Sequence, residues 1–85
     1  MRVTLYGKEN CGMCMAAKDK LVRLGVEFEV RDLEYLTAYH EGWREDGSVE
    51  LQAAYALLRN KVPIISIDGE WFDYPGSMRH LKGRK

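Results

Sequence analysis

The sequence predicts an α/β protein in which a four-stranded mixed sheet is flanked by helices. Residues 3–6 form a short β-rich segment, residues 12–24 have helical spacing, and residues 26–31 alternate as a strand does. Residues 64–72 indicate two further strands around an Asp-Gly pair, which favours a two-residue hairpin. A strand–helix–strand unit pairs its strands in parallel and a hairpin pairs them antiparallel, so the sheet is mixed.

The first strand and the helix after it have clear apolar faces. In the strand, Val3 and Leu5 lie on the face opposite Thr4 and Tyr6. Gly25 is a fitting stop signal for the helix. The apolar stripe of that helix repeats every three or four residues and consists of Cys14, Ala17, Leu21 and Leu24.

The next two segments differ in how clear their pattern is. Residues 26–31 predict a half-buried strand whose core-facing residues are Val26, Phe28 and Val30. Residues 33–47 have helical spacing for a turn or two, and we expect an extra helical segment there that packs against the core. The alternative is a partner-specific surface near the active site. The aromatic residues of this segment are Tyr35, Tyr39 and Trp43.

Two more helices are expected in the second half of the chain. Ser48 is the predicted N-cap of a helix that reaches about Arg59. A short final helix is expected near residues 77–82, after Pro75-Gly76-Ser77. The apolar face of the longer helix consists of Leu51, Ala54, Tyr55 and Leu58.

Composition restricts the function. The chain has 85 residues, of which 31% are charged, and we expect one domain over 1–85. Lys and Arg number 13, as do Asp and Glu, so no nucleic-acid partner is expected. No apolar run approaches the roughly 20 residues that cross a bilayer, and residues 1–10 lack the pattern of a secretory signal. We therefore expect a cytoplasmic monomer without a membrane partner.

Two cysteines three residues apart form the candidate catalytic site. Cys11-Gly12-Met13-Cys14 lies between the first strand and the helix, and in a reducing compartment this arrangement favours redox chemistry over a structural disulfide. The helix N-terminus, capped by Asn10 or by Cys11 itself, favours the thiolate of Cys11, which is the attacking species in disulfide exchange. Cys14 falls on the apolar stripe, and this position suits a buried resolving thiol.

Two other interpretations of the cysteine pair are weaker. Inert buried thiols would not place Cys11 at a loop edge, ahead of the apolar stripe. A structural zinc ion needs four ligands, and only His40 and His80 add nitrogen, without partner spacing. We therefore expect no bound metal.

Two segments of the sequence together resemble the glutaredoxin family. One contains a strand end, a lysine and the dithiol, and it reads Tyr6-Gly7-Lys8-Glu9-Asn10-Cys11-Gly12-Met13-Cys14. The other follows the second major helix and reads Val62-Pro63-Ile64-Ile65-Ser66-Ile67-Asp68-Gly69. The resemblance implies a thioredoxin-like fold, a thiol–disulfide oxidoreductase working through Cys11 and Cys14, and a cis Pro63 that faces the dithiol. It also implies that the backbone of Val62 pairs with the extended chain of the substrate.

The same resemblance suggests where glutathione would bind. Lys8 and Lys61 are the candidate cations for one carboxylate, and Val62 would pair with the cysteinyl part. Gly76 and Ser77, ahead of the last helix, would offer N–H groups to the other carboxylate.

The sequence departs from the family pattern in places that matter for glutathione. Gly-Met separates the cysteines, Lys61 stands where threonine is usual, and Gly-Gly is absent before the last helix. Asp73 would repel a carboxylate, and an exposed pair of Trp71 and Phe72 would suit a protein partner. We therefore expect disulfide-containing proteins as substrates, with weak or no glutathione binding and no bound cofactor.

The resemblance leaves the reductant and two further functions open. Either glutathione or a thioredoxin-reductase-type enzyme would reduce the dithiol, and residues 68–72 also resemble the small redoxins that serve ribonucleotide reductase. A relative that binds a bridged iron–sulfur cluster through Cys11 and glutathione is the other alternative. Cys14 argues against that alternative, because a dithiol can leave the cluster as a disulfide.

Overall fold

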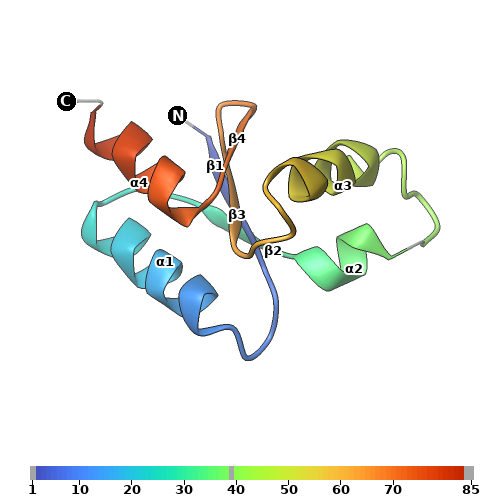
Figure 1. Ribbon diagram of the computed structural model, residues 1–85, viewed down its shortest axis with the longest axis horizontal. Coiled ribbons are helices and arrows are strands. Elements are labelled where there is room, and N and C mark those ends of the chain that lie inside the picture. Colours follow the sequence, from blue (N-terminus) through green and yellow to red (C-terminus); the bar gives the residue numbers. More distant parts are fainter. Residues whose placement is uncertain (1, 39, 84–85) are drawn as a thin grey trace.

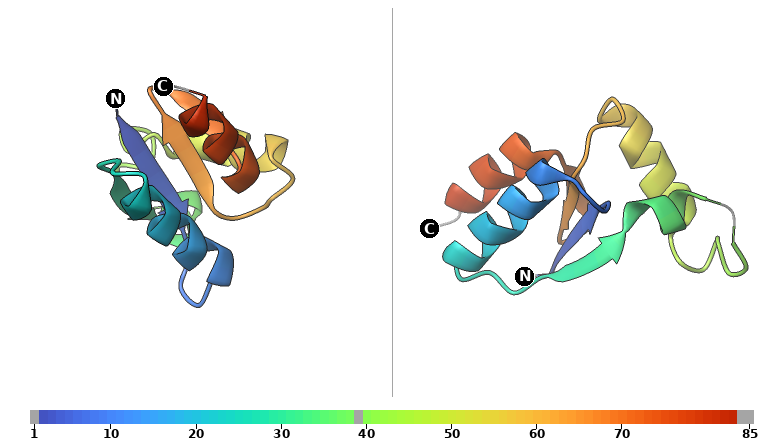
Figure 2. Two further views of the ribbon diagram at one scale, coloured as in Figure 1. Left: turned by 90° about the vertical axis from the view of Figure 1, so that its left-hand side faces the viewer. Right: turned by 90° about the horizontal axis from the view of Figure 1, so that it is seen from below.

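The structure is a computed structural model that describes residues 2–38 and 40–83. Its elements confirm the predicted α/β class (Figure 1). In chain order they are β1 (Val3–Gly7), α1 (Gly12–Arg23), β2 (Glu29–Asp32), α2 (Leu33–Thr37), α3 (Ser48–Leu57), β3 (Ile64–Ile67), β4 (Glu70–Phe72) and α4 (Tyr74–Lys82). Helices α1 and α4 lie side by side on one face of the sheet, with α2 and α3 away from them (Figure 2).

The four strands form one mixed sheet in the order β2-β1-β3-β4. Strand β1 pairs in parallel with β2, where Leu5 lies opposite Val30, and antiparallel with β3, where Leu5 lies opposite Ile65. Strands β3 and β4 form the predicted hairpin, and both residues of its Asp68-Gly69 turn have positive φ. The C-terminal end of β1, which leads to the cysteines, therefore lies in the middle of the sheet.

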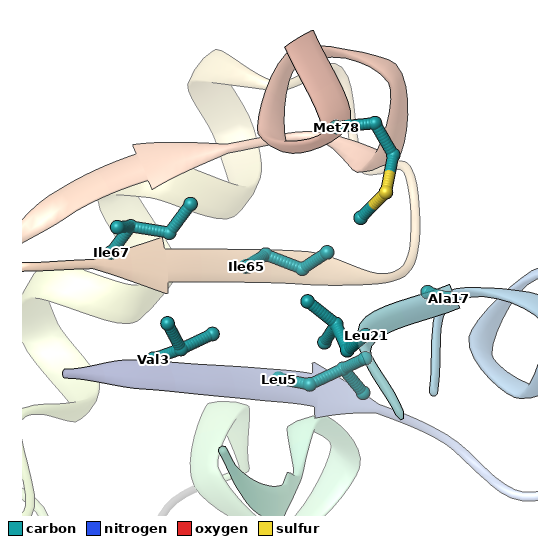
Figure 3. Packing of buried hydrophobic residues seen from close by; sticks show 7 residues of the cluster. All are labelled: Val3, Leu5, Ala17, Leu21, Ile65, Ile67 and Met78. Carbon is teal, nitrogen blue, oxygen red and sulfur yellow. The ribbon is translucent and has the colours of Figure 1, made fainter. Parts of the chain in front are cut away.

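The main core lies between the sheet and the pair α1 and α4. Alternation in β1 points Val3 and Leu5 into this core, as predicted (Figure 3). Helix α1 adds Ala17 and Leu21 from its stripe, whereas Leu24, predicted on the same stripe, is the C-cap and is exposed. The buried residues of this core are Val3, Leu5, Ala17, Leu21, Ile65, Ile67 and Met78.

A second, smaller core lies on the opposite face, toward the end of β1. Leu33 and Leu36 of α2 pack there with Leu51 of α3 and Ile64 of β3. Tyr6 contributes from β1, with its ring centroid 5.6 Å from that of Trp71. The expectation that residues 33–47 pack an extra helix on the core is therefore confirmed for α2.

The rest of that segment is a turn-rich loop rather than a longer helix. The indole N–H of Trp43 donates to the carbonyl of Leu36 at 3.1 Å, and His40 Nε2 lies 2.7 Å from Asp46 Oδ2. These contacts close the loop onto the end of α2. The packing expected of Tyr39 lies outside the described residues.

The prediction for 26–31 is wrong in extent and in part of its burial. The strand begins only at Glu29, and Val30 is 51% exposed, although Val26 and Phe28 pack on the main core. Strand β2 is an edge of the sheet, and Val30 lines a pocket there instead of packing into the main core.

Two helix starts also differ from the prediction. Gly47, with φ of 76°, is the N-cap of α3, so Ser48 lies inside the helix. Its hydroxyl is buried and has no hydrogen-bond partner among residues 2–38 and 40–83. Helix α4 begins at Tyr74, ahead of the predicted residue 77, because Asp73 caps it and a proline suits the first turn.

Candidate active site

Cys11 caps the first helix. Its backbone is extended, and its Sγ accepts the backbone N–H of Cys14 with an N···S distance of 3.2 Å. Asn10, the other candidate cap, has a positive φ of 56° and turns the chain into the helix instead. Cys11 is partly exposed, and Gly12 and Met13 beside it are exposed. A substrate can therefore reach the Sγ of Cys11.

Cys14 lies in a different environment. It is 3% exposed and, like Cys11, a free thiol. Burial raises the pKa of Cys14 above its ordinary value of 9.0, as does the hydrogen bond with Cys11, while the backbone N–H of Lys8 and the charge of Lys18 oppose this increase. The raised pKa favours the neutral thiol of Cys14, which is consistent with the resolving role predicted for it.

Gly7 makes room for Cys14. A Cβ atom at Gly7 would lie 3.0 Å from Cys14 Sγ and 3.2 Å from its Cβ, tighter than side chains normally pack. The last residue of β1 is thus small because the first turn of α1 rests on it.

Pro63 lies at the same end of the sheet as the dithiol. The Val62–Pro63 bond is cis, as the resemblance predicted. The antiparallel register pairs Tyr6 with Ile64, so the next residues outward are Gly7 and Pro63. Pro63 is buried and Val62 half-buried against the second core. The bond therefore lies on the β3 flank of the segment that leads from β1 to Cys11.

A pocket opens on the other flank, beside β2. It has a volume of about 320 Å³. Lys8, predicted as a substrate-binding cation, is one of its lining residues, whereas Lys61 is not. The pocket is lined by Gly7, Lys8, Glu9, Cys14, Lys18, Val30, Arg31 and Asp32.

Lys61 lines a separate hollow near the end of α3. Asp73 and Arg59 line it as well. The structure thus places Lys61 in the same hollow as the carboxylate that was expected to repel glutathione, whereas Lys8 lines the pocket beside β2.

The expected anion donors at Gly76 and Ser77 are already in use. The N–H of Gly76 donates to Asp73 Oδ1 at 2.7 Å, and the N–H of Ser77 donates to the carbonyl of Asp73 at 2.9 Å. Ser77 is fully buried, and its hydroxyl donates to the carbonyl of Tyr74. The expectation that these groups lie ahead of the last helix and are open to a carboxylate is therefore wrong for this structure, because Asp73 occupies the capping position.

Trp71 and Phe72 do not form an exposed pair. Alternation in β4 sends Trp71 to the second core and Phe72 to the main core, and both side chains are partly buried. The ring of Phe72 lies 4.8 Å from that of His80. This correction removes the aromatic pair as a reason to expect a protein partner.

Within residues 2–38 and 40–83, no three His, Cys, Asp or Glu side chains gather as a metal site would require. Across the same residues, no helix is both long and apolar enough to span a membrane.

The fold and the site together define a thioredoxin-like α/β protein with a dithiol at the start of its first helix. The chain belongs to the glutaredoxin family, whose sequence profile matches residues 3–72. This membership supports a thiol–disulfide redox function. No curated protein sequence matches the chain significantly.

Solved structures support the same fold. Reduced Escherichia coli glutaredoxin is 21% identical with a TM-score of 0.69, and the match covers 99% of this chain and 96% of that one. Escherichia coli NrdH-redoxin is 19% identical with a TM-score of 0.63, covering 100% and 96%. Wheat glutaredoxin is 24% identical with a TM-score of 0.61, covering 98% and 73%.

Sequence reasoning missed several residues around the dithiol. Lys18 lies one helical turn after Cys14, and this spacing was sufficient to find it. Arg31 and Asp32 approach through strand pairing, since Asp32 lies opposite Gly7. The sequence carries no local signal for that approach.

Proposed function

We propose that this protein is a cytoplasmic reductase of protein disulfides that works through Cys11 and Cys14. One observation carries the proposal. An accessible sulfur caps α1, and a buried sulfur follows it by three residues, with the N–H of Cys14 donating to Cys11 Sγ at 3.2 Å. That N–H would stabilise negative charge on the attacking sulfur.

The reaction would proceed in two exchanges. The Cys11 thiolate attacks one sulfur of the substrate disulfide, forming a mixed disulfide and releasing the other sulfur as a thiolate, which takes a proton from water. Cys14 then loses its proton and attacks Cys11 Sγ. The second substrate thiol leaves, and the enzyme holds a Cys11–Cys14 disulfide. Two electrons have passed from the dithiol to the substrate.

The opposite roles of the two thiols follow from burial. Cys11 is accessible and attacks first, whereas the raised pKa of Cys14 delays its ionisation. The positive charge of Lys18 favours the Cys14 thiolate once it forms.

For the reductant, we propose that a thioredoxin-reductase-type enzyme serves better than glutathione. Asp73 caps α4 and takes the N–H of Gly76, so the positive end of that helix faces a carboxylate of the chain itself. Lys61 shares its hollow with the same Asp73. The NrdH-redoxin of Escherichia coli is described as a glutaredoxin-like protein with a thioredoxin-like activity profile. Residues 68–72 resemble the small redoxins that serve ribonucleotide reductase, so electron donation to that enzyme is the second candidate function.

Two coupled assays test both statements. The oxidised protein is mixed with thioredoxin reductase and NADPH, or with glutathione, glutathione reductase and NADPH, and NADPH consumption is followed with insulin as the disulfide substrate. We expect turnover in the first assay and little in the second. Turnover in neither assay, or a brown anaerobic preparation with visible absorbance from an iron–sulfur cluster, would contradict the proposal.

A further inference from the structure

The pocket beside Cys14 gathers cations from three elements. Lys8 comes from the segment after β1, Lys18 from α1, and Arg31 from β2. These residues are far apart in the sequence, and the parallel pairing of β1 with β2 brings Arg31 opposite Tyr6, next to them. The positive charge therefore results from the fold and not from a basic run of sequence.

None of these three cations is part of an ion pair within the described part of the chain. The ion pairs found there are Arg23–Asp19 and His40–Asp46. Two carboxylates also line the pocket, those of Glu9 and Asp32.

Of the two carboxylates, that of Asp32 also caps the N-terminus of α2. Its Oδ1 accepts the N–H groups of Glu34 at 2.9 Å and Tyr35 at 3.3 Å, at the start of α2. Its negative charge is therefore partly compensated by that helix terminus. The pocket keeps an excess of positive charge.

The pocket lies next to the dithiol, so its positive charge is close to the place where a substrate would react. Cys14 forms part of its wall, and Cys11 is three residues away on the same helix. Pro63 and this pocket lie on opposite flanks of the segment that leads to Cys11, so a polypeptide whose disulfide meets Cys11 has a path along each of them. An extended chain advances about 3.3 Å per residue, so a side chain one to three residues from the substrate cysteine lies about 3–10 Å along the chain from it, and side chains in this range are the candidates to enter the pocket.

We propose that this pocket is an anion subsite for a carboxylate side chain of the substrate protein, close to the disulfide that is reduced. The inference rests on the proposed function and extends it, because it names the substrates as disulfides flanked by Asp or Glu. Glutathione also carries carboxylates, and the test below separates the two sources.

The test compares matched disulfide peptides that differ only at the position two residues from the cysteine, which is Glu, Gln or Lys. The quantity measured is kcat/KM for reduction, at low salt and at 1 M NaCl. We expect the Glu peptide to exceed the Gln peptide by about three- to tenfold at low salt, with Lys below Gln, because the carboxylate faces more than one cation and each exposed ion pair contributes up to about fivefold. The preference should fall toward one at 1 M salt, where charges are screened within about 3 Å.

Variants assign the preference to the pocket. Arg31→Gln and Lys18→Gln should each lower the Glu-to-Gln ratio by about two- to fivefold. Lys20→Gln is the matched control, because Lys20 lies on the same helix but does not line the pocket. It should leave the ratio unchanged.

Other results would contradict the subsite, and one of them would also contradict the proposed function. A ratio near one with normal reduction of uncharged bis(2-hydroxyethyl) disulfide would overturn the subsite alone, as would a ratio that both variants leave unchanged. Failure to reduce even the uncharged disulfide would overturn the proposed function and the subsite with it. Oxidised glutathione that shifts the backbone amides of Lys18 and Arg31 as strongly as the Glu peptide does, in the Cys11→Ser protein, would assign the pocket to glutathione instead.

Discussion

Gly7 and Cys14 are in such close contact that any side chain at the last residue of β1 would crowd the sulfur of Cys14. A Cβ atom at Gly7 would lie 3.0 Å from Cys14 Sγ and 3.3 Å from Leu5 Cδ2. This contact couples the position of the Cys14 thiol to the end of strand β1. It also explains why a glycine stands where the sequence alone indicates only the start of a turn.

We expect Gly7→Ala to destabilise the reduced protein by about 1–3 kcal/mol, because the added methyl group must displace Cys14 or Leu5. For a domain of this size that corresponds to a fall in Tm of several degrees, about 4–8 °C per kcal/mol. Thermal unfolding in excess reductant measures it. Gly12→Ala is the matched control, since a Cβ at Gly12 would meet nothing within 4 Å. An equal loss in both variants would refute the contact as the cause.

The two cysteines should respond differently to substitution and to alkylation. Cys11→Ser should abolish disulfide reduction, whereas Cys14→Ser should accumulate a mixed disulfide with the substrate. In the Cys11→Ser protein, iodoacetamide should modify Cys14 slowly below about pH 9, because burial raises the pKa of that thiol. Mass spectrometry of the reduced wild-type protein should find Cys11 modified first. Faster modification of Cys14 would reverse the assigned roles.

Asp73 should limit glutathione binding through its charge and its hydrogen bond with Gly76. We expect a titration of glutathione into the Cys14→Ser protein, followed by amide NMR shifts, to show weak or no binding. Adding Asp73→Ser should strengthen binding, because serine keeps a capping oxygen for the helix and removes the negative charge that repels a carboxylate. Asp73→Ala removes the capping oxygen as well as the charge, so its comparison with Asp73→Ser isolates the effect of the cap. We expect Asp73→Ala to cost about 0.5–2 kcal/mol of stability. Saturable low-millimolar binding before any change at Asp73 would contradict this account.

His40 should make the stability of the 38–47 loop depend on pH. Its Nδ1 lies 3.0 Å from the carbonyl oxygen of Ala38 and its Nε2 lies 2.7 Å from Asp46 Oδ2, so both ring nitrogens face acceptors. The carbonyl of Ala38, and then Asp46, raise the pKa of His40 above its ordinary value of 6.5. Folding therefore favours the imidazolium, whose stabilising effect is complete below pH 6.5 and is lost as pH rises through the raised pKa.

The corresponding experiment compares Tm with pH for the wild-type protein and His40→Gln. The difference between them should be largest in mildly acid solution and should shrink as the pH becomes alkaline. Asp46→Asn should lose part of the same pH dependence, whereas His80→Gln, at a site remote from the loop, should retain it. A difference between wild type and His40→Gln that stays constant with pH would argue against the charged form.

Sequence patterns predicted the parts of the fold that depend on local chemistry. The stripe through Ala17 and Leu21, the Asp68-Gly69 turn and the position of Cys11 ahead of a helix all follow from spacing and are confirmed. The start of α4 was misplaced because Asp73 was considered only as a charge, although aspartate is a preferred N-cap.

Properties that depend on neighbours from distant segments could not be predicted in this way. Alternation identified the faces of 26–31, but it does not show that Val30 belongs to an edge strand that no helix covers. The approach of Arg31 to the dithiol depends likewise on the register between β1 and β2. Tertiary context therefore sets the environment of the site, even though its two sulfur atoms are evident from spacing alone.

The strand order has a consequence for how the molecule opens. Strands β1 and β3 are each paired on both sides, and one residue of each, Leu5 and Ile65, is fully buried in the main core. Strands β2 and β4 are edges of four and three residues. Backbone amides of β1 and β3 should thus exchange with deuterium only on global unfolding, while edge amides exchange through smaller local openings. The slowest-exchanging amides should therefore lie in the strand that leads directly to Cys11 and in the strand that follows Pro63.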